Sequence, residues 1–117
     1  MTILDTIVAQ KRIEVEKKKL NHDVSFLKRQ PAYSRNCFSL KSGLLDPEAT
    51  GIIAEFKRKS PSKGWINASA DPIAVTGSYQ AAGASGISIL TDESFFGGKN
   101  EDIINCRPHL DIPILRK

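Results

Sequence analysis

Three short apolar segments, separated by helix-like stretches, constrain the fold of this chain more than any other feature. They lie at about 51–57, 84–91 and 113–117, and short apolar runs bounded by glycine or proline are typical of buried strands. Between the first two, Asp71-Pro72 predicts a helix that runs to about Ala82, before Gly83. A second, shorter helix is predicted at 101–106. This alternation predicts an α/β fold built from parallel βα units.

The first fifty residues follow a different pattern. Thr2 begins a predicted amphipathic helix over about 2–19, with an acid placed as in a capping box. Two shorter helices are predicted, one from Asp23 to about Gln30 and one over 38–45. We therefore expect two parts. Residues 1–50 form an N-terminal helical extension, and residues 51–117 form a βαβαβ portion.

The first predicted strand ends in an acid and a base, Glu55 and Lys57, followed by a Ser-Pro-Ser-Lys-Gly loop that begins at Ser60. Side chains alternate along a strand, so Glu55 and Lys57 point to the same side, about 7 Å apart at their Cα atoms. One interpretation is an ion pair where the strand meets water. The other is an active-site acid and base at the mouth of a parallel sheet, with Ser60 and the loop amides placed for an anion.

The position of these residues favours a functional site. In parallel α/β folds the chemistry gathers in loops beyond the carboxyl ends of the strands. Glu55 and Lys57, the loop at Ser60, the Phe95-Phe96 loop after the second strand and Lys117 after the third all lie at such ends.

Composition narrows the class of partner. The chain of 117 residues suits one small domain, and its net charge of +4 fits either nucleic acid or a small anionic substrate. The bases of the helix at 2–19 interleave with acids and lack aromatic neighbours, which indicates a solvated face, so nucleic acid is not an expected partner. No apolar run reaches the length of a membrane span and no signal peptide is visible, so we expect a cytoplasmic protein without a membrane partner. Cys37 and Cys106 lack metal-ligand spacing, and we expect them to be reduced.

Several motifs, in order and at matching spacing, resemble the indole-3-glycerol phosphate synthase family. Residues 53–64, Ile-Ala-Glu-Phe-Lys-Arg-Lys-Ser-Pro-Ser-Lys-Gly, resemble the family signature. Residues 88–92 with 95–98, residues 113–117, and the helix beginning Ile3-Leu4 resemble its second strand and loop, its third strand and its N-terminal helix. The resemblance implies a TIM barrel, here the N-terminal extension plus the first three parallel strands with two intervening helices.

The resemblance also implies an activity and roles for individual residues. The activity is the indole-forming step of tryptophan biosynthesis, in which 1-(2-carboxyphenylamino)-1-deoxyribulose 5-phosphate closes its ring and loses carbon dioxide and water. No metal or organic cofactor is implied, and the full-length protein is expected to be a monomer. The implied roles are Lys117 as general acid in ring closure, Lys57 as a contact for the substrate's anionic groups and an acid for dehydration, Glu55 as the group that orients these lysines and takes part in proton transfer, Ser60 as a phosphate ligand, and Pro61 and Phe96 as apolar walls around the anthranilate ring.

Three strands are fewer than the eight βα units, typically about 250 residues, of a closed barrel. We therefore expect the 117 residues by themselves to be inactive, and to self-associate through open sheet edges or to fold poorly. The alternative function is a non-catalytic βα fragment that binds phosphate or a partner chain. A related enzyme of tryptophan synthesis, phosphoribosylanthranilate isomerase, is disfavoured by the Glu-x-Lys-x-x-Ser-Pro-Ser run.

Overall fold

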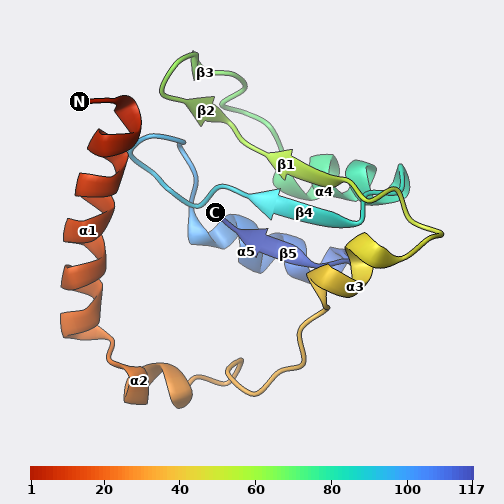
Figure 1. Ribbon diagram of the computed structural model, residues 1–117, viewed down its shortest axis with the longest axis horizontal. Helices are drawn as coiled ribbons and strands as arrows, with labels where there is room; N and C mark the ends of the chain where they lie inside the picture. Colours follow the sequence, from red (N-terminus) through yellow and green to blue (C-terminus); the bar gives the residue numbers. More distant parts are fainter. The chain divides into compact units, whose positions relative to one another are not determined.

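The computed structural model describes residues 1–117, which form two compact units, Met1–Asn36 and Cys37–Lys117 (Figure 1). The first unit holds α1 (Ile3–Asn21) and α2 (Val24–Lys28). None of the helices is both long and apolar enough to cross a membrane.

The helices of the first unit begin where the sequence predicted. The Thr2 backbone amide donates to the Asp5 carboxylate at 2.7 Å, and the Asp5 amide donates to the Thr2 hydroxyl at 3.2 Å, which completes a capping box. Asp23 caps α2, since its carboxylate accepts from the Phe26 amide at 2.7 Å. Helix α1 continues to Asn21, slightly beyond its predicted end at 19.

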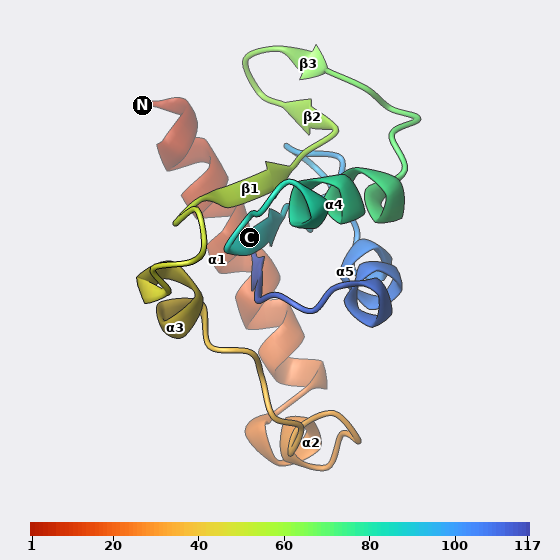
Figure 2. The same cartoon turned by 90° about the vertical axis from the view of Figure 1, so that its right-hand side faces the viewer.

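The second unit is built on a parallel sheet of three strands in the order β1-β4-β5. The strands are β1 (Ile53–Phe56), β4 (Gly86–Ile89) and β5 (Ile114–Arg116). Helices α4 (Pro72–Ala81) and α5 (Asn100–Cys106) connect them and lie on the same face of the sheet (Figure 2). The predicted α/β class and the parallel βαβαβ order are therefore confirmed.

The core lies between this sheet and its two helices. All four residues of the central strand β4 are buried. The buried apolar cluster consists of Phe56, Ile87, Ile89, Cys106 and Leu110. Strand β4 has a neighbouring strand on each side and helices on one face. Its residues are therefore buried, which explains why this strand is a short apolar run in the sequence.

Helix α3 (Leu40–Leu45) belongs to the second unit and packs near the amino ends of the strands. A Cβ atom on Gly43 would lie 2.9 Å from the carbonyl oxygen of Ser85, so the helix backbone approaches the start of β4 closely. Compactness divides the chain after Asn36. The division into 1–50 and 51–117, which follows the order of elements along a barrel, stays a prediction.

Part of the segment predicted as a loop after β1 is a small antiparallel hairpin, β2 (Lys59–Ser60) paired with β3 (Gly64–Trp65). Gly64 has φ +64°, a conformation that glycine adopts without steric cost and that closes the turn. The Trp65 ring packs against Gly97, where a Cβ atom would be 2.8 Å from the ring, and the Lys59 ammonium lies 5.2 Å from the ring centroid. These contacts join the hairpin to the loop after β4, which a local sequence pattern does not reveal.

Candidate active site

Four polar side chains meet at the carboxyl ends of the three parallel strands. The Glu55 carboxylate at the end of β1 is their centre. Its Oε1 lies 3.7 Å from the Lys57 ammonium, and its Oε2 lies 3.2 Å from the Lys117 ammonium. Oε2 also accepts a hydrogen bond from the Ser88 hydroxyl at 3.1 Å. We call Glu55, Lys57, Ser88 and Lys117 the carboxylate cluster.

Strand register explains why residues so distant in sequence meet. Glu55 is the direct partner of Ser88 in the parallel ladder between β1 and β4. On the other side of β4, Ile89 is paired with Arg116, which places Lys117 one residue beyond the end of β5. Because carboxyl ends of parallel strands meet at one edge, the third strand delivers Lys117 to the acid on the first strand.

The cluster is accessible to a ligand. The side chain of Glu55 is 32% exposed and that of Lys117 is 60% exposed. Ion pairs with this much solvent contact contribute only about 0–1 kcal/mol, so the Lys117 ammonium can exchange Glu55 for a bound anion or carbonyl oxygen at little cost. An ammonium held beside an acid in this way can donate a proton and stabilise developing negative charge on oxygen.

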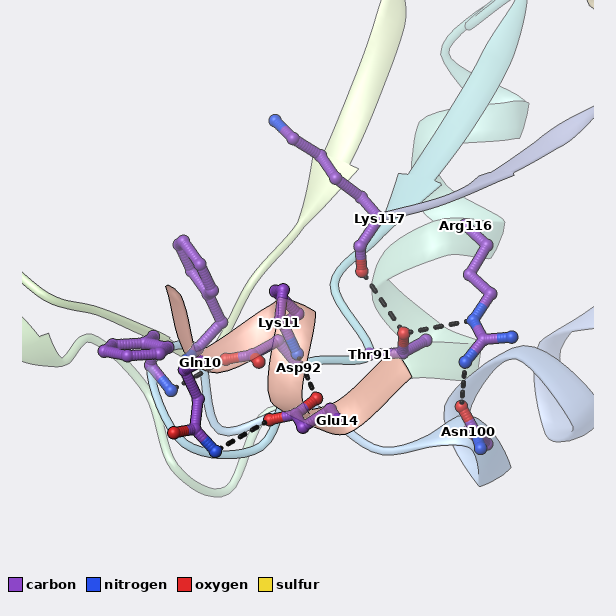
Figure 3. A network of polar contacts seen from close by, with 10 residues as sticks. Gln10, Lys11, Glu14, Thr91, Asp92, Asn100, Arg116 and Lys117 are labelled. Carbon is purple, nitrogen blue, oxygen red and sulfur yellow. Dashed lines mark hydrogen bonds and ion pairs between the residues drawn. The ribbon is translucent and has the colours of Figure 1, made fainter. Parts of the chain in front are cut away.

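The backbone of Lys117 is held separately from its side chain (Figure 3). Its carbonyl oxygen accepts from the Thr91 amide at 2.7 Å and from the Thr91 hydroxyl at 3.2 Å, while its amide donates to the Ile89 carbonyl at 3.0 Å. The Arg116 guanidinium donates to the Thr91 hydroxyl at 3.3 Å and to the Asn100 side chain at 3.1 Å. In Figure 3 the Lys117 ammonium points away from Thr91. The contacts that fix the backbone therefore do not occupy the charged end of the side chain.

Ser60 and Pro61 lie in the hairpin rather than in the carboxylate cluster. Ser60 is buried, and its hydroxyl accepts from the Lys63 amide at 3.2 Å, whereas Pro61 is exposed. Neither residue makes a hydrogen bond or ion pair with Glu55, Lys57 or Lys117. Their assignment to phosphate and aromatic ring therefore stays a prediction.

Phe96 belongs to a tightly constrained loop after β4. The Asp92 carboxylate accepts from the Phe95 amide at 2.7 Å and from the Phe96 amide at 3.2 Å, and the Gly98 amide donates to the Asp92 carbonyl at 2.7 Å. A Cβ atom on Gly98 would lie 2.0 Å from the Leu90 carbonyl oxygen, so only glycine fits there. Phe96 is half-buried on this fixed loop, and its role as an apolar wall also stays a prediction.

Comparisons with known proteins identify the family of the chain. The profile described as indole-3-glycerol phosphate synthase matches residues 4–117. The chain belongs to the indole-3-glycerol phosphate synthase family. It is 49% identical over 115 residues to the indole-3-glycerol phosphate synthase of Bacteroides thetaiotaomicron, covering 98% of this chain and 44% of the relative. It is 42% identical over 118 residues to that of Listeria monocytogenes, and 40% identical over 116 residues to that of Halalkalibacterium halodurans, with 44% and 42% of those relatives covered, and 100% and 98% of this chain.

The resemblance seen in the motifs is thus confirmed as membership of the synthase family. The chain spans less than half the length of these relatives. The assignment of Glu55, Lys57 and Lys117 to the site of these synthases stays a prediction.

Two contacts in and beside the carboxylate cluster were not predicted from the sequence. Ser88 was seen only as part of an apolar strand, although a lone hydroxyl in the buried run 86–90 is a signal that it has a polar partner. Arg58 was named only as part of the motif at 53–64, without a role of its own. In the structure its guanidinium forms a bidentate ion pair with Asp102 on α5, at 2.5 and 3.0 Å. Arg58 itself lies between the predicted site residues Lys57 and Ser60 along the chain.

The Arg58–Asp102 pair is buried, with side chains 10% and 1% exposed. Hydrogen bonding to Asp102 raises the pKa of the Arg58 guanidinium above its ordinary value, against the opposing effect of burial. The guanidinium carbon also lies 4.9 Å from the centroid of the Phe56 ring. The pair ties the segment after β1 to α5 and so fixes where the hairpin begins.

The residues described here form no group of three or more His, Cys, Asp or Glu side chains arranged to hold a metal ion. The expectation that the reaction needs no metal or organic cofactor stays a prediction.

Proposed function

We propose that the full-length protein is an indole-3-glycerol phosphate synthase, a decarboxylating carbon–carbon lyase of tryptophan biosynthesis. Its substrate is 1-(2-carboxyphenylamino)-1-deoxyribulose 5-phosphate. The observation that carries the proposal is the Glu55 carboxylate holding the ammonium groups of Lys57 and Lys117 on its two oxygens. Membership of the synthase family supports it.

The cluster suits the proton transfers of this reaction. The ring carbon that bears the carboxylate attacks the ketone carbon, and the Lys117 ammonium donates its proton to the ketone oxygen as that oxygen gains charge. Carbon dioxide then leaves from the ring carbon, which restores aromaticity. In the last step the Lys57 ammonium protonates the departing hydroxyl, which leaves as water, and a proton is lost from the neighbouring carbon. The Glu55 carboxylate orients both donors and takes part in these transfers.

We assign the rest of the substrate to the predicted loop residues. Ser60 binds the phosphate, and Pro61 and Phe96 flank the anthranilate ring. The phosphorylated substrate and the two unpaired cysteines, Cys37 and Cys106, suit a cytoplasmic enzyme. Nucleic acid is not expected to bind, because bases of α1 pair with acids of the same helix, as in Lys19–Glu16 at 3.0 Å.

The proposal is tested by following indole fluorescence and carbon dioxide release when the full-length protein is mixed with substrate. We expect turnover, and we expect Lys117→Met and Glu55→Gln to lower kcat by about 10²- to 10⁴-fold, the usual contribution of a positioned acid or base. Lys41→Met, at an exposed lysine of α3, is the control. Product formation by Lys117→Met at the wild-type rate would exclude the assigned role, and no turnover by the wild type would exclude the function.

We further propose that the full-length protein is a monomer, whereas residues 1–117 expressed by themselves self-associate. Strands β1 and β5 each pair only with β4, so each has one edge with unpaired backbone groups. Light scattering after size-exclusion chromatography gives the mass of both species. A monodisperse monomer of residues 1–117 would contradict the proposal for the shorter chain.

A further inference from the structure

One member of the carboxylate cluster has no assigned part in the reaction. Ser88 lies in the middle of the sheet, on β4, directly opposite Glu55 in the parallel ladder. Its side chain faces the Glu55 carboxylate, and its hydroxyl donates to Oε2 at 3.1 Å. Only 3% of Ser88 is exposed to solvent.

Ser88 lies between apolar residues of its strand, and its hydroxyl has the Glu55 carboxylate as its hydrogen-bond partner. The neighbours of Ser88 along the strand, Ile87 and Ile89, are buried and apolar. A buried hydroxyl without a hydrogen bond is costly, and the bond to Glu55 is the one that the Ser88 side chain makes. A glutamate carboxylate rotates easily about its last side-chain bond. The hydrogen bond therefore fixes which oxygen faces β4 and, as a consequence, which oxygen faces Lys57.

Ser88 and Lys117 compete for the same acceptor. The hydroxyl at 3.1 Å and the ammonium at 3.2 Å both approach Oε2 of Glu55. Two donors that share one oxygen each draw on its negative charge, so each weakens the bond of the other. When Lys117 leaves Glu55 for the substrate, the hydroxyl remains to satisfy Oε2. Without it, the carboxylate holds Lys117 more tightly.

We propose that Ser88 is a positioning residue that orients the Glu55 carboxylate and releases the Lys117 ammonium to the substrate. This role rests on the proposed synthase function. The hydrogen bond of the Ser88 side chain goes to Glu55 and not to the predicted phosphate ligand Ser60, so we infer that it acts on the chemical step rather than on substrate binding.

The test compares Ser88→Ala and Ser88→Cys in the full-length protein. Alanine removes the hydroxyl, while cysteine keeps a side chain of similar shape but is a weak hydrogen-bond donor. We expect both to lower kcat by about 10- to 100-fold, the range for a hydrogen bond to a charged group, with KM unchanged. Ser78→Ala is the matched control, because the exposed Ser78 hydroxyl only donates to a carbonyl of its own helix, at 2.9 Å. Wild-type kcat in Ser88→Cys would mean that shape, not the hydroxyl, matters, and would overturn the proposal.

A second measurement does not need turnover. Acetylation of Lys117, followed by mass spectrometry relative to the exposed Lys41, reports how tightly Glu55 holds the ammonium. We expect Ser88→Ala to slow the acetylation of Lys117 several-fold relative to Lys41, and an unchanged ratio would overturn the positioning role. If the wild type shows no turnover, the synthase function fails and the acetylation ratio still decides the role of Ser88. If the wild type turns over and Ser88→Ala matches it, the function stands and the positioning role fails.

Discussion

Removing the carboxylate of Asp102 tests whether the buried ion pair with Arg58 supports this part of the fold. The replacement Asp102→Ala leaves the Arg58 guanidinium without its acidic partner. Two hydrogen bonds, at 2.5 and 3.0 Å, are lost at once. The weak remaining bond from Arg58 to the Ala70 carbonyl, at 3.4 Å, does not replace them.

The burial of both side chains sets the size of the effect. With 10% and 1% of these side chains exposed, water cannot readily solvate the abandoned charge. Breaking a buried pair by removing one partner typically costs about 3–5 kcal/mol. That is a large share of the roughly 5–15 kcal/mol that stabilises a typical protein. We expect a fall in Tm of roughly 10 °C, since about 1 kcal/mol corresponds to a few degrees in a chain of this class.

The assay is equilibrium unfolding of the full-length protein in urea, with thermal melts as a second probe. Asp102→Asn is expected to cost a similar amount, because its amide group turns one acceptor into a donor facing the guanidinium. The double replacement Arg58→Met with Asp102→Leu removes both charges and should recover most of the loss. The matched control is Glu16→Ala, whose partner Lys19 lies 3.0 Å away in a pair with side chains 72% and 67% exposed. It should change the free energy of unfolding by less than about 0.5 kcal/mol.

The reasoning is refuted if Asp102→Ala costs no more than Glu16→Ala. It is also refuted if the double replacement is less stable than Asp102→Ala, because the loss would then come from packing around the side chains rather than from an unpaired charge.

Three further outcomes follow from local geometry. Gly98→Ala should destabilise the protein by more than 1 kcal/mol in urea unfolding, because its Cβ would lie 2.0 Å from the Leu90 carbonyl oxygen, while Gly77→Ala in open space on α4 should stabilise it by about 0.5–1 kcal/mol; equal effects would contradict this. Burial raises the pKa of the Cys106 thiol above its ordinary 9.0, so the stability that its protonated form provides is present below pH 9.0 and is lost as the pH rises toward the folded-state pKa. The free energy of unfolding, measured from about pH 8 to 10, should therefore fall less steeply with pH in Cys106→Ala than in the wild type. Hydrogen bonds from Thr2 lower the pKa of Asp5, so the capping box stabilises α1 above pH 3.8 and is lost as the pH falls through the lower folded-state pKa. Amides in the first turn of α1 should then exchange faster relative to their intrinsic rate at the same pH. Unchanged protection of these amides would contradict the prediction.

The helix caps show what local sequence can predict. Thr2, Asp23 and Asp71 each precede a helix and cap it in the structure, because a cap needs only a side-chain oxygen and an amide two or three residues away. The three parallel strands were equally visible, since each is a short apolar run between breakers. These features depend on neighbours in the chain, and the sequence contains those neighbours.

The site was predicted in part. Glu55 lies on β1 and Lys57 one residue beyond its end, two residues apart, so the alternation predicted for an extended segment places them together. Lys117 was assigned through family motifs and through the rule that parallel strands share a carboxyl edge. Its 3.2 Å contact with Glu55, however, depends on the register of β4 with both neighbours, and no local pattern contains that register.

The sequence by itself therefore determined the order and type of the helices and of the three parallel strands, the family, and the residues at the strand ends, but not the hairpin of β2 and β3. The tertiary structure alone decided which of those residues touch. Ser88 facing Glu55, Asp102 pairing with Arg58, and Trp65 packing on Gly97 join segments 32 to 44 residues apart along the chain. The physical reason is that such contacts depend on packing and strand register, which are properties of the assembled sheet rather than of any one segment.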